Sequence, residues 1–315
     1  MSLLTLFPAH GPLPPEPSLA AALYWYSPPI ITLLVAVGLA AWFLALRRIL
    51  RDHPGNPVPR SRTVAAVGAA LLLLLALQSG IERYDTTLFS VHMVQHLILL
   101  FPVPILILRA APVTLILRLA SPRWRARILA LLQSRLVSVI SHPIAAWFLL
   151  VFVMWATHLS SLFDAALDDP FLHNLEHVIY LSSALLFWAP VFSLDPVRHR
   201  LSRPAALFYL ITQMPQNSFL GVAIMWAPSV LYPHYERLQR PWGPTPLEDQ
   251  QLAGAIMWLV GDGLFLLAVF AVLAAWMRTE ERPASRYDAE KLAEELAEIR
   301  RREVVHAERQ RGGVE

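Results

Sequence analysis

The chain has 315 residues, of which 56% are hydrophobic and only 16% are charged, and its mean hydropathy is +0.48. Because soluble domains carry about 25% charged residues, this composition indicates an integral membrane protein. The formal charge of +3 does not indicate nucleic-acid binding, since the basic residues are grouped between apolar runs. The absence of cysteine excludes disulfides, thiolate zinc sites and iron–sulfur clusters, so a metal would need His, Met, carboxylate or amide ligands.

The chain begins with a proline-rich stretch that contains no Lys or Arg. It lacks the basic region of a cleavable signal peptide, so we expect residues 1–27 to form a short external segment of the mature protein. Residues 28–277 then contain about seven apolar runs that approach the roughly 20 residues needed to cross a bilayer. These runs are residues 28–46, 63–81, 88–108, 143–159, 172–193, 205–226 and 252–277.

Between the third and fourth runs, residues 109–141 contain apolar stretches that are short and interrupted by arginine, which favours amphipathic helices at the membrane surface. The last residues, 278–315, are charged and rich in helix formers. They are typical of a solvated helical tail, and we assign them no chemistry.

Arginine is distributed unevenly between the connections that join the predicted spans. Connections 47–62, 109–141 and 194–204 carry five, six and three Arg, whereas the alternate connections 82–87, 160–171 and 227–251 together carry three Arg and eight carboxylates. The positive-inside rule therefore places the N-terminus outside and the C-terminal tail in the cytoplasm. The predicted fold class is an all-α bundle of about seven transmembrane helices.

Seven of the eleven histidines fall outside the membrane or at the outer ends of predicted spans: His10, His92, His96, His158, His173, His177 and His234. Two pairs, in the sequences "HMVQH" and "HNLEH", are spaced i and i+4, so each pair projects from one face of a helix. Together with His158, at the end of the fourth span, they occupy one layer of one membrane face. A single such histidine is usually a structural residue, but five in one layer favour a binding site.

Neutral imidazole binds copper, zinc and haem iron, so the neighbouring side chains help to choose between these metals. Thioether sulfur favours Cu(I), and Met93, Met154 and Met257 lie near the predicted layer. Methionine is also an ordinary filler of helical cores. Glu176 lies beside one histidine pair, where it can orient an imidazole or act as a general base.

A second polar layer is predicted deeper in the membrane. Gln213 and Asn217 flank Pro215 near the middle of the sixth span, and Asp262 lies within the seventh. A carboxylate in the middle of a span needs a partner, which either Gln213 or Asn217 can supply, unless Asp262 stays protonated. In the third span, Pro102 and Pro104 predict a kink below the histidines.

Four motifs in order, "HMVQH", "HNLEH", "MPQNSFLGVAI" and "DQQLAGAIMW", resemble the polytopic CtaG family of cytochrome c oxidase assembly factors. The single-span, cysteine-bearing copper chaperone that shares this name is a different protein. The resemblance covers roughly residues 20–277 and implies a role in the maturation of haem–copper oxidases, with oxidase subunits or copper chaperones as partners. It also carries over a set of positions: His92, Gln95, His96, His173, Glu176, His177, Asp249, Gln250, Gln251 and Met257. After "IMW" the Pro-Gly break expected of the family is replaced by Leu259, Val260 and Gly261.

We therefore predict a non-enzymatic assembly factor that binds copper at the outer histidines. A haem b protein is an alternative, because histidines on neighbouring helices can ligate a haem. A third is a seven-span zinc hydrolase, since "HNLEH" matches the H-x-x-E-H zinc peptidase pattern with Glu176 as base. A scaffold that binds no metal is the fourth.

Overall fold

A computed structural model describes residues 13–18, 21 and 29–279 of the chain. Most of the predicted external segment and nearly all of the predicted cytoplasmic tail lie outside these residues. The chain divides into two compact units, Met1–Leu266 and Leu267–Glu315. The described residues contain helices and no strand, which confirms the all-α class.

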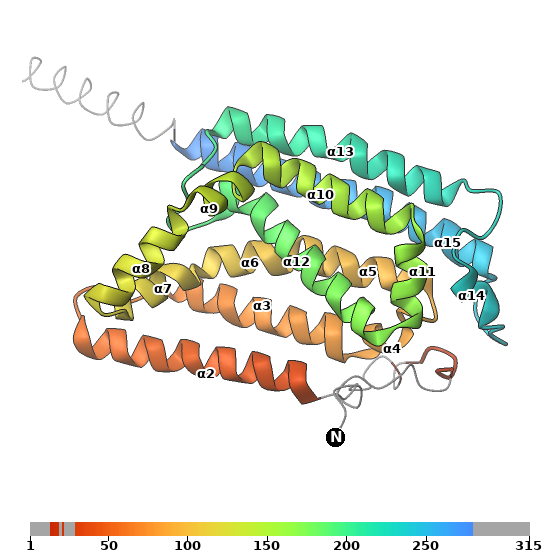
Figure 1. Cartoon of the computed structure of the whole chain (residues 1–315), viewed down its shortest axis with the longest axis horizontal. Helices are drawn as coiled ribbons and strands as arrows, with labels where there is room; N and C mark the ends of the chain where they lie inside the picture. The colour runs from red at the N-terminus through yellow and green to blue at the C-terminus, as the bar shows by residue number, and fades with distance from the viewer. Residues whose placement is uncertain (1–12, 19–20, 22–28, 280–315) are drawn as a thin grey trace, which may run out of the picture. The chain divides into compact units, whose positions relative to one another are not determined.

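The helices of the first unit are shown in Figure 1. They are α2 (Pro29–Asp52), α3 (Arg60–Gln78), α4 (Gly80–Tyr84), α5 (Phe89–Leu100), α6 (Pro102–Ala110), α7 (Pro112–Leu119), α8 (Pro122–Leu132), α9 (Arg135–Ile140), α10 (Pro143–His158), α11 (Ser161–Asp168), α12 (Pro170–Phe192), α13 (Arg203–Met225), α14 (Pro233–Arg237), α15 (Pro246–Ala255) and the π-helix η2 (Ile256–Val260). Helix α12 packs against α10, α5 and α6, and α15 packs against α13 and α5. Helices α5 and α12 are therefore central to the bundle.

Each of the seven predicted apolar runs forms a helix or a pair of helices. Five helical segments are long and apolar enough to cross a membrane, and a sixth span results if α10 and α11, which are bent by 71°, count as one. Helix α13 has 23 residues, but its amide side chains make it too polar to meet the same criterion. A multi-pass membrane protein is thus supported, whereas the count of seven spans and the orientation of the termini stay predictions.

The predicted interruption of the third span is present at Phe101. Helix α5 ends at Leu100 and α6 begins at Pro102, and Phe101 between them has non-helical dihedral angles of −116° and −80°. Proline lacks a backbone N–H and so cannot continue the helical hydrogen bonding. The regular helical hydrogen bonding is therefore interrupted just after the histidines of α5.

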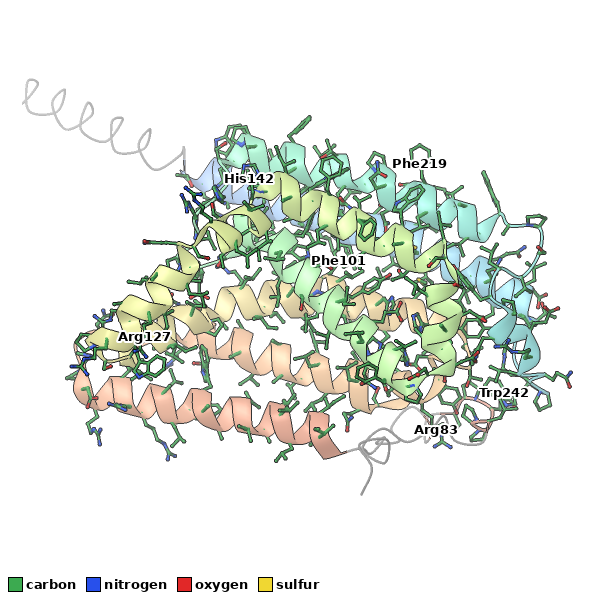
Figure 2. The ribbon with its side chains drawn as sticks, in the orientation of Figure 1. Arg83, Phe101, Arg127, His142, Phe219 and Trp242 are labelled. Atoms are coloured by element: carbon green, nitrogen blue, oxygen red, sulfur yellow. The ribbon has the colours of Figure 1, made fainter. Side chains whose placement is uncertain are left out.

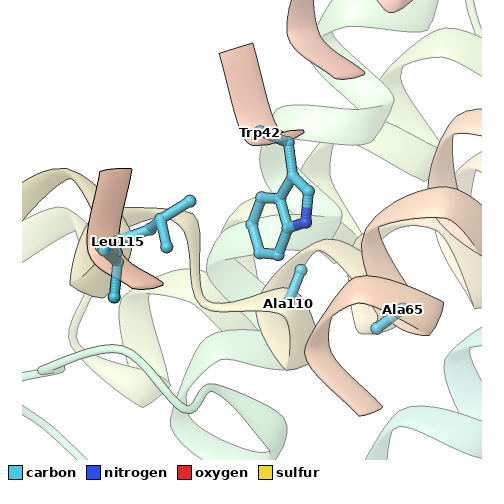
Figure 3. Packing of buried hydrophobic residues seen from close by; sticks show 5 residues of the cluster. Trp42, Ala65, Ala110 and Leu115 are labelled. Atoms are coloured by element: carbon cyan, nitrogen blue, oxygen red, sulfur yellow. The ribbon is translucent and has the colours of Figure 1, made fainter. Parts of the chain in front are cut away.

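Residues 109–141 contain three short helices, α7, α8 and α9, where the sequence indicates two amphipathic ones, and α8 and α9 bury none of their residues. Helix α7 instead contributes Leu115 to a hydrophobic cluster with Trp42 of α2, Ala65 of α3 and Ala110 of α6 (Figure 3). This cluster lies at the end of the bundle opposite to the histidines of α5. In Figure 2, Arg127 and His142 lie at that end, whereas Arg83 and Trp242 lie at the other.

Two glycines allow α13 and α15 to approach closely. A Cβ atom built on Gly254 would lie 2.5 Å from the backbone nitrogen of Met225 and 2.7 Å from the backbone oxygen of Gly221. Small residues at such contacts are common between membrane helices, because they let two backbones touch. This contact fixes α15, and with it the residues that α15 presents to α5.

The deeper polar layer is partly as predicted. The side-chain amide of Asn217 donates to Asp262 at 3.0 Å and to the backbone oxygen of Met257 at 2.9 Å. Ser218, which the sequence did not single out, donates to the other Asp262 oxygen at 2.5 Å. Gln213 is buried without a hydrogen-bond partner among the described residues, so Asn217 rather than Gln213 pairs with Asp262.

Asn217→Ala is expected to destabilise the protein by about 1–2 kcal/mol, because it leaves the buried carbonyl of Met257 and the half-buried carboxylate of Asp262 with fewer donors. Reversible unfolding in mixed micelles measures this change. Gln216→Ala, at a partly exposed neighbouring position, serves as the control and is expected to have little effect. Equal stability of the two variants would contradict the proposed pairing.

Candidate metal centre

Five buried histidines from three helices form one cluster. Within α5 the ring centroids of His92 and His96 are 4.1 Å apart, and within α12 those of His173 and His177 are 4.4 Å apart. Between the helices, His92 stacks on His173 at 5.5 Å and His96 lies 5.9 Å from His177. His158, at the end of α10, is 6.5 Å from His96. The predicted layer of histidines is therefore brought together in space.

The N-termini of α5 and α12 are capped by aspartates. Asp169 accepts from the backbone N–H groups of the first turn of α12, and Pro170 begins the helix. Helix α5 has no cap from its own preceding residue, and Asp249 of α15 fills this role. It accepts from the backbone N–H of Phe89 at 2.6 Å and from the hydroxyl of Ser90 at 2.5 Å. A carboxylate at a helix N-terminus also interacts favourably with the helix dipole.

Several polar atoms in the cluster have no hydrogen-bond partner in the part of the chain that the structure describes. They include both ring nitrogens of His92 and of His96, Nε2 of His158 and both carboxylate oxygens of Glu176. Nδ1 of His158 lies 2.8 Å from the backbone oxygen of Met154, which orients the ring and leaves Nε2 as the available nitrogen. Buried polar atoms are normally paired, so this concentration of partnerless atoms points to a ligand.

Three carboxylates lie in or beside the cluster. Glu176 comes from α12, Glu82 from α4, and Asp85 follows α4 directly. Nε2 of His173 is 3.5 Å from Asp85. Burial raises the pKa of Asp85 well above its ordinary value, and the nearby Glu82 raises it further. A cation would relieve this accumulation of buried carboxylates.

Gln95 connects the histidines to the carboxylates. Its amide nitrogen donates to Glu82 at 2.7 Å and to the backbone oxygen of Ala76 at 2.9 Å. Its amide oxygen accepts from Nε2 of His177 at 3.1 Å. The side chain thus holds a histidine of α12 in a fixed orientation from α5, as partners of metal ligands commonly do.

The potential ligand atoms fall into two compact groups. The first triad consists of His92, His96 and Glu176, and the second triad of Asp85, His173 and His177. Within each triad the ligand atoms lie within 4.8 Å of one another. His158 belongs to neither triad but borders the first through His96. Two imidazoles and a carboxylate are a ligand set that divalent transition metals accept.

The family model described as cytochrome c oxidase caa3 assembly factor, Caa3_CtaG, matches residues 40–279 of the chain. The chain belongs to this family. Its curated relatives include the uncharacterized proteins Mb0105 of Mycobacterium bovis and MT0111 of Mycobacterium tuberculosis, each 31% identical over 88% of this chain and 43% of the relative. The uncharacterized protein ML1998 of Mycobacterium leprae is 29% identical over 81% of this chain and 39% of its own length. The chain therefore spans less than half the length of these relatives, and no solved structure matches it.

Of the other positions carried over from the CtaG family, only Gln95 lies in the cluster with the histidines and Glu176. Gln250 instead bonds the chain that follows α13, through the N–H of Leu231 and the backbone oxygen of Ser229, and Gln251 is exposed. Met93, Met154 and Met257 are buried, and a thioether ligand from one of them stays a prediction.

The sequence did not identify Glu82 and Asp85 of this CtaG-family protein as candidates. The sequence shows these two carboxylates in "IERYD", at the outer end of the second predicted span and just before "HMVQH". Their position in a connection between spans is typical of the acidic outer connections that set membrane topology. Their burial beside the histidines depends on the packing of α4 against α5, which the sequence pattern does not reveal.

The connection between α13 and α15 covers the outer end of the cluster. The hydroxyl of Tyr232 donates to the backbone oxygen of His158 at 3.0 Å, and that of Tyr235 donates to the backbone oxygen of Asp85 at 3.0 Å. His234, on the predicted outer side, lies outside the cluster and pairs with Asp168 at 2.6 Å.

Aromatic side chains close the other side of the cluster. Phe101, which follows α5, packs against Trp188 of α12 and against Phe265, at centroid distances of 5.7 and 4.8 Å. Phe187 stacks on Tyr209 of α13 at 4.7 Å. Trp188 also donates its ring N–H to the backbone oxygen of Leu100 at 2.7 Å. This aromatic layer separates the histidines from the remainder of the bundle along α5 and α12.

Proposed function

We propose that this protein binds copper as a cargo in the buried histidine cluster and supplies it to cytochrome c oxidase during assembly in the bacterial plasma membrane. One observation carries the proposal. Five buried imidazoles and a buried glutamate converge. Both ring nitrogens of His92 and of His96 and both oxygens of Glu176 have no partner within the described part of the chain. Membership of an oxidase assembly family supplies the process in which a metal cargo would be needed.

The energetic argument begins with the solvation of the side chains. Burying a polar group without a hydrogen bond costs roughly 1–3 kcal/mol by protein mutational data, and burying an unpaired carboxylate costs more. The cluster repeats this cost at His92, His96 and Glu176. A bound metal ion offsets this free-energy cost, because the neutral imidazoles and the carboxylate coordinate the ion in place of the water that they lost on burial.

The choice of copper rests on the ligands and on the assigned process. Imidazole and carboxylate sites bind Cu(II) more tightly than the neighbouring divalent metals, following the Irving–Williams order. Haem–copper oxidases contain copper, and the histidines lie at the predicted outer membrane face. The aromatic layer behind the cluster favours loading and release on the same side over transport across the membrane.

The geometry gives less support to the hydrolase alternative. Glu176 groups with the histidines of α5 rather than with the two histidines of its own H-x-x-E-H motif. That placement suits a ligand better than the general base of a zinc peptidase.

Metal analysis and an optical spectrum of the purified protein test the proposal. We expect wild-type protein loaded with Cu(II) and then desalted to retain stoichiometric copper, without a Soret band. His92→Ala/His96→Ala is expected to lose most of it. The matched control, His142→Ala/His199→Ala, removes two histidines whose rings lie 5.0 Å apart outside the cluster and should retain copper.

Three results would count against copper handling. Substoichiometric copper that does not change in the His92→Ala/His96→Ala variant would refute the site. A Soret band would identify a haem protein. Tightly bound zinc with hydrolysis of a lipid amide, lost on Glu176→Gln, would identify a hydrolase.

A further inference from the structure

The cluster contains two sets of ligands that share no residue. The first triad takes His92 and His96 from α5 and Glu176 from α12, and the second takes Asp85 from the end of α4 and both histidines of the "HNLEH" motif. Each set therefore provides two imidazoles and one carboxylate, and filling one does not consume a ligand of the other.

The two triads are adjacent. Helix α12 contributes to both: Glu176 belongs to the first triad, and His177, the next residue in the chain, belongs to the second. The triads also meet across the two helices, where His92 of the first stacks on His173 of the second with ring centroids 5.5 Å apart. Residues that belong to different triads are thus in ring contact, so the two ligand sets lie side by side within the histidine cluster.

Further side chains support each triad separately. Nε2 of His158 has no partner among the described residues, and its ring lies 6.5 Å from that of His96, so it is available as a fourth ligand of the first triad. On the other side, Gln95 holds His177 of the second triad while it donates to Glu82. Glu82 adds a third carboxylate beside the two triads.

We propose that the two triads form a dinuclear site that holds two copper ions at once, one on His92, His96 and Glu176 and the other on Asp85, His173 and His177. This inference rests on the proposed function, which requires only that the histidine cluster binds copper. It adds that the cargo is a pair of copper ions.

Copper content and electron paramagnetic resonance of the full chain in detergent test this inference. Wild type loaded with Cu(II) is expected to retain about two ions per chain, as two His₂-carboxylate sets allow. Its two Cu(II) ions should be magnetically coupled, with less signal than the copper content predicts. Two double variants, His92→Ala/Glu176→Gln and Asp85→Asn/His173→Ala, are each expected to retain one ion with the full signal of isolated Cu(II).

The possible outcomes separate the two proposals. Absence of retained copper in wild type would overturn the proposed function itself. Retention of one ion with an uncoupled signal, or loss of both ions in either double variant that still elutes as wild type on size exclusion, would overturn only the dinuclear site. The wild-type signal decides the question even where a variant fails to fold.

Discussion

Gly254→Ala is expected to destabilise the protein by about 1–3 kcal/mol, because the added methyl group overlaps backbone atoms rather than a movable side chain. Its Cβ would lie 2.5 Å from the backbone nitrogen of Met225, closer than any allowed contact. Helices α13 and α15 must then separate, and the contacts of α15 with α5 weaken with them. Reversible unfolding in mixed micelles measures the loss.

The same chain provides a control at Gly263, where an added Cβ meets nothing within 4 Å. Alanine is intrinsically better than glycine inside a helix, by about 1 kcal/mol, so Gly263→Ala is expected to be neutral or stabilising. The two substitutions are chemically identical and lie close together in the chain. If Gly254→Ala were as stable as Gly263→Ala, the close approach of α13 and α15 would be wrong.

Asp249→Ala is expected to have the second large effect, a destabilisation of about 3–5 kcal/mol, the range measured when one partner of a buried ion pair is removed. Asp249 caps α5 through Phe89 and Ser90, and it lies 4.0 Å from the guanidinium of the buried Arg240. Its removal leaves the first N–H groups of α5 without their acceptor and a buried positive charge without its counter-ion. Unfolding in mixed micelles again measures stability.

The Asp249→Ala variant is also expected to bind less copper, because α5 carries His92 and His96 within the first two turns after the cap. Glu248→Ala is the matched control, since Glu248 is the neighbouring carboxylate but bonds only Thr245, in an exposed capping box. We expect a much smaller loss of stability and unchanged copper content. Normal copper retention by folded Asp249→Ala would show that the cap does not position the histidines.

The histidine cluster could be predicted from the sequence because the pattern that indicates it is local. Four of the five histidines occur in two i, i+4 pairs, and the helical repeat alone places each pair on one face. The apolar runs predicted where those helices begin, so the two pairs could be assigned to one layer. The structure confirms that His92, His96, His173 and His177 come together, and it adds their ring contacts.

Other features depend on packing between distant segments and have no local signature. Asp85 and Glu82 are typical residues of a connection between spans, and only the packing of the short helix α4 against α5 buries them. Gly221 and Gly254 are far apart in sequence, and neither stands in a motif that indicates a helix contact. Asp262 needed a partner, but the choice of Asn217 over Gln213 depends on the relative rotation of two helices.

The tyrosines that cover the cluster bond to backbone oxygens of His158 and Asp85, not to any ligand side chain. Displacement of this connection therefore leaves both ligand sets intact. A binding partner that pulled the connection away would accelerate loading and unloading to the same degree and leave the dissociation constant unchanged. The residence time of the cargo and its affinity would then be controlled by different parts of the molecule, so that a tightly bound ion need not be a slowly released one.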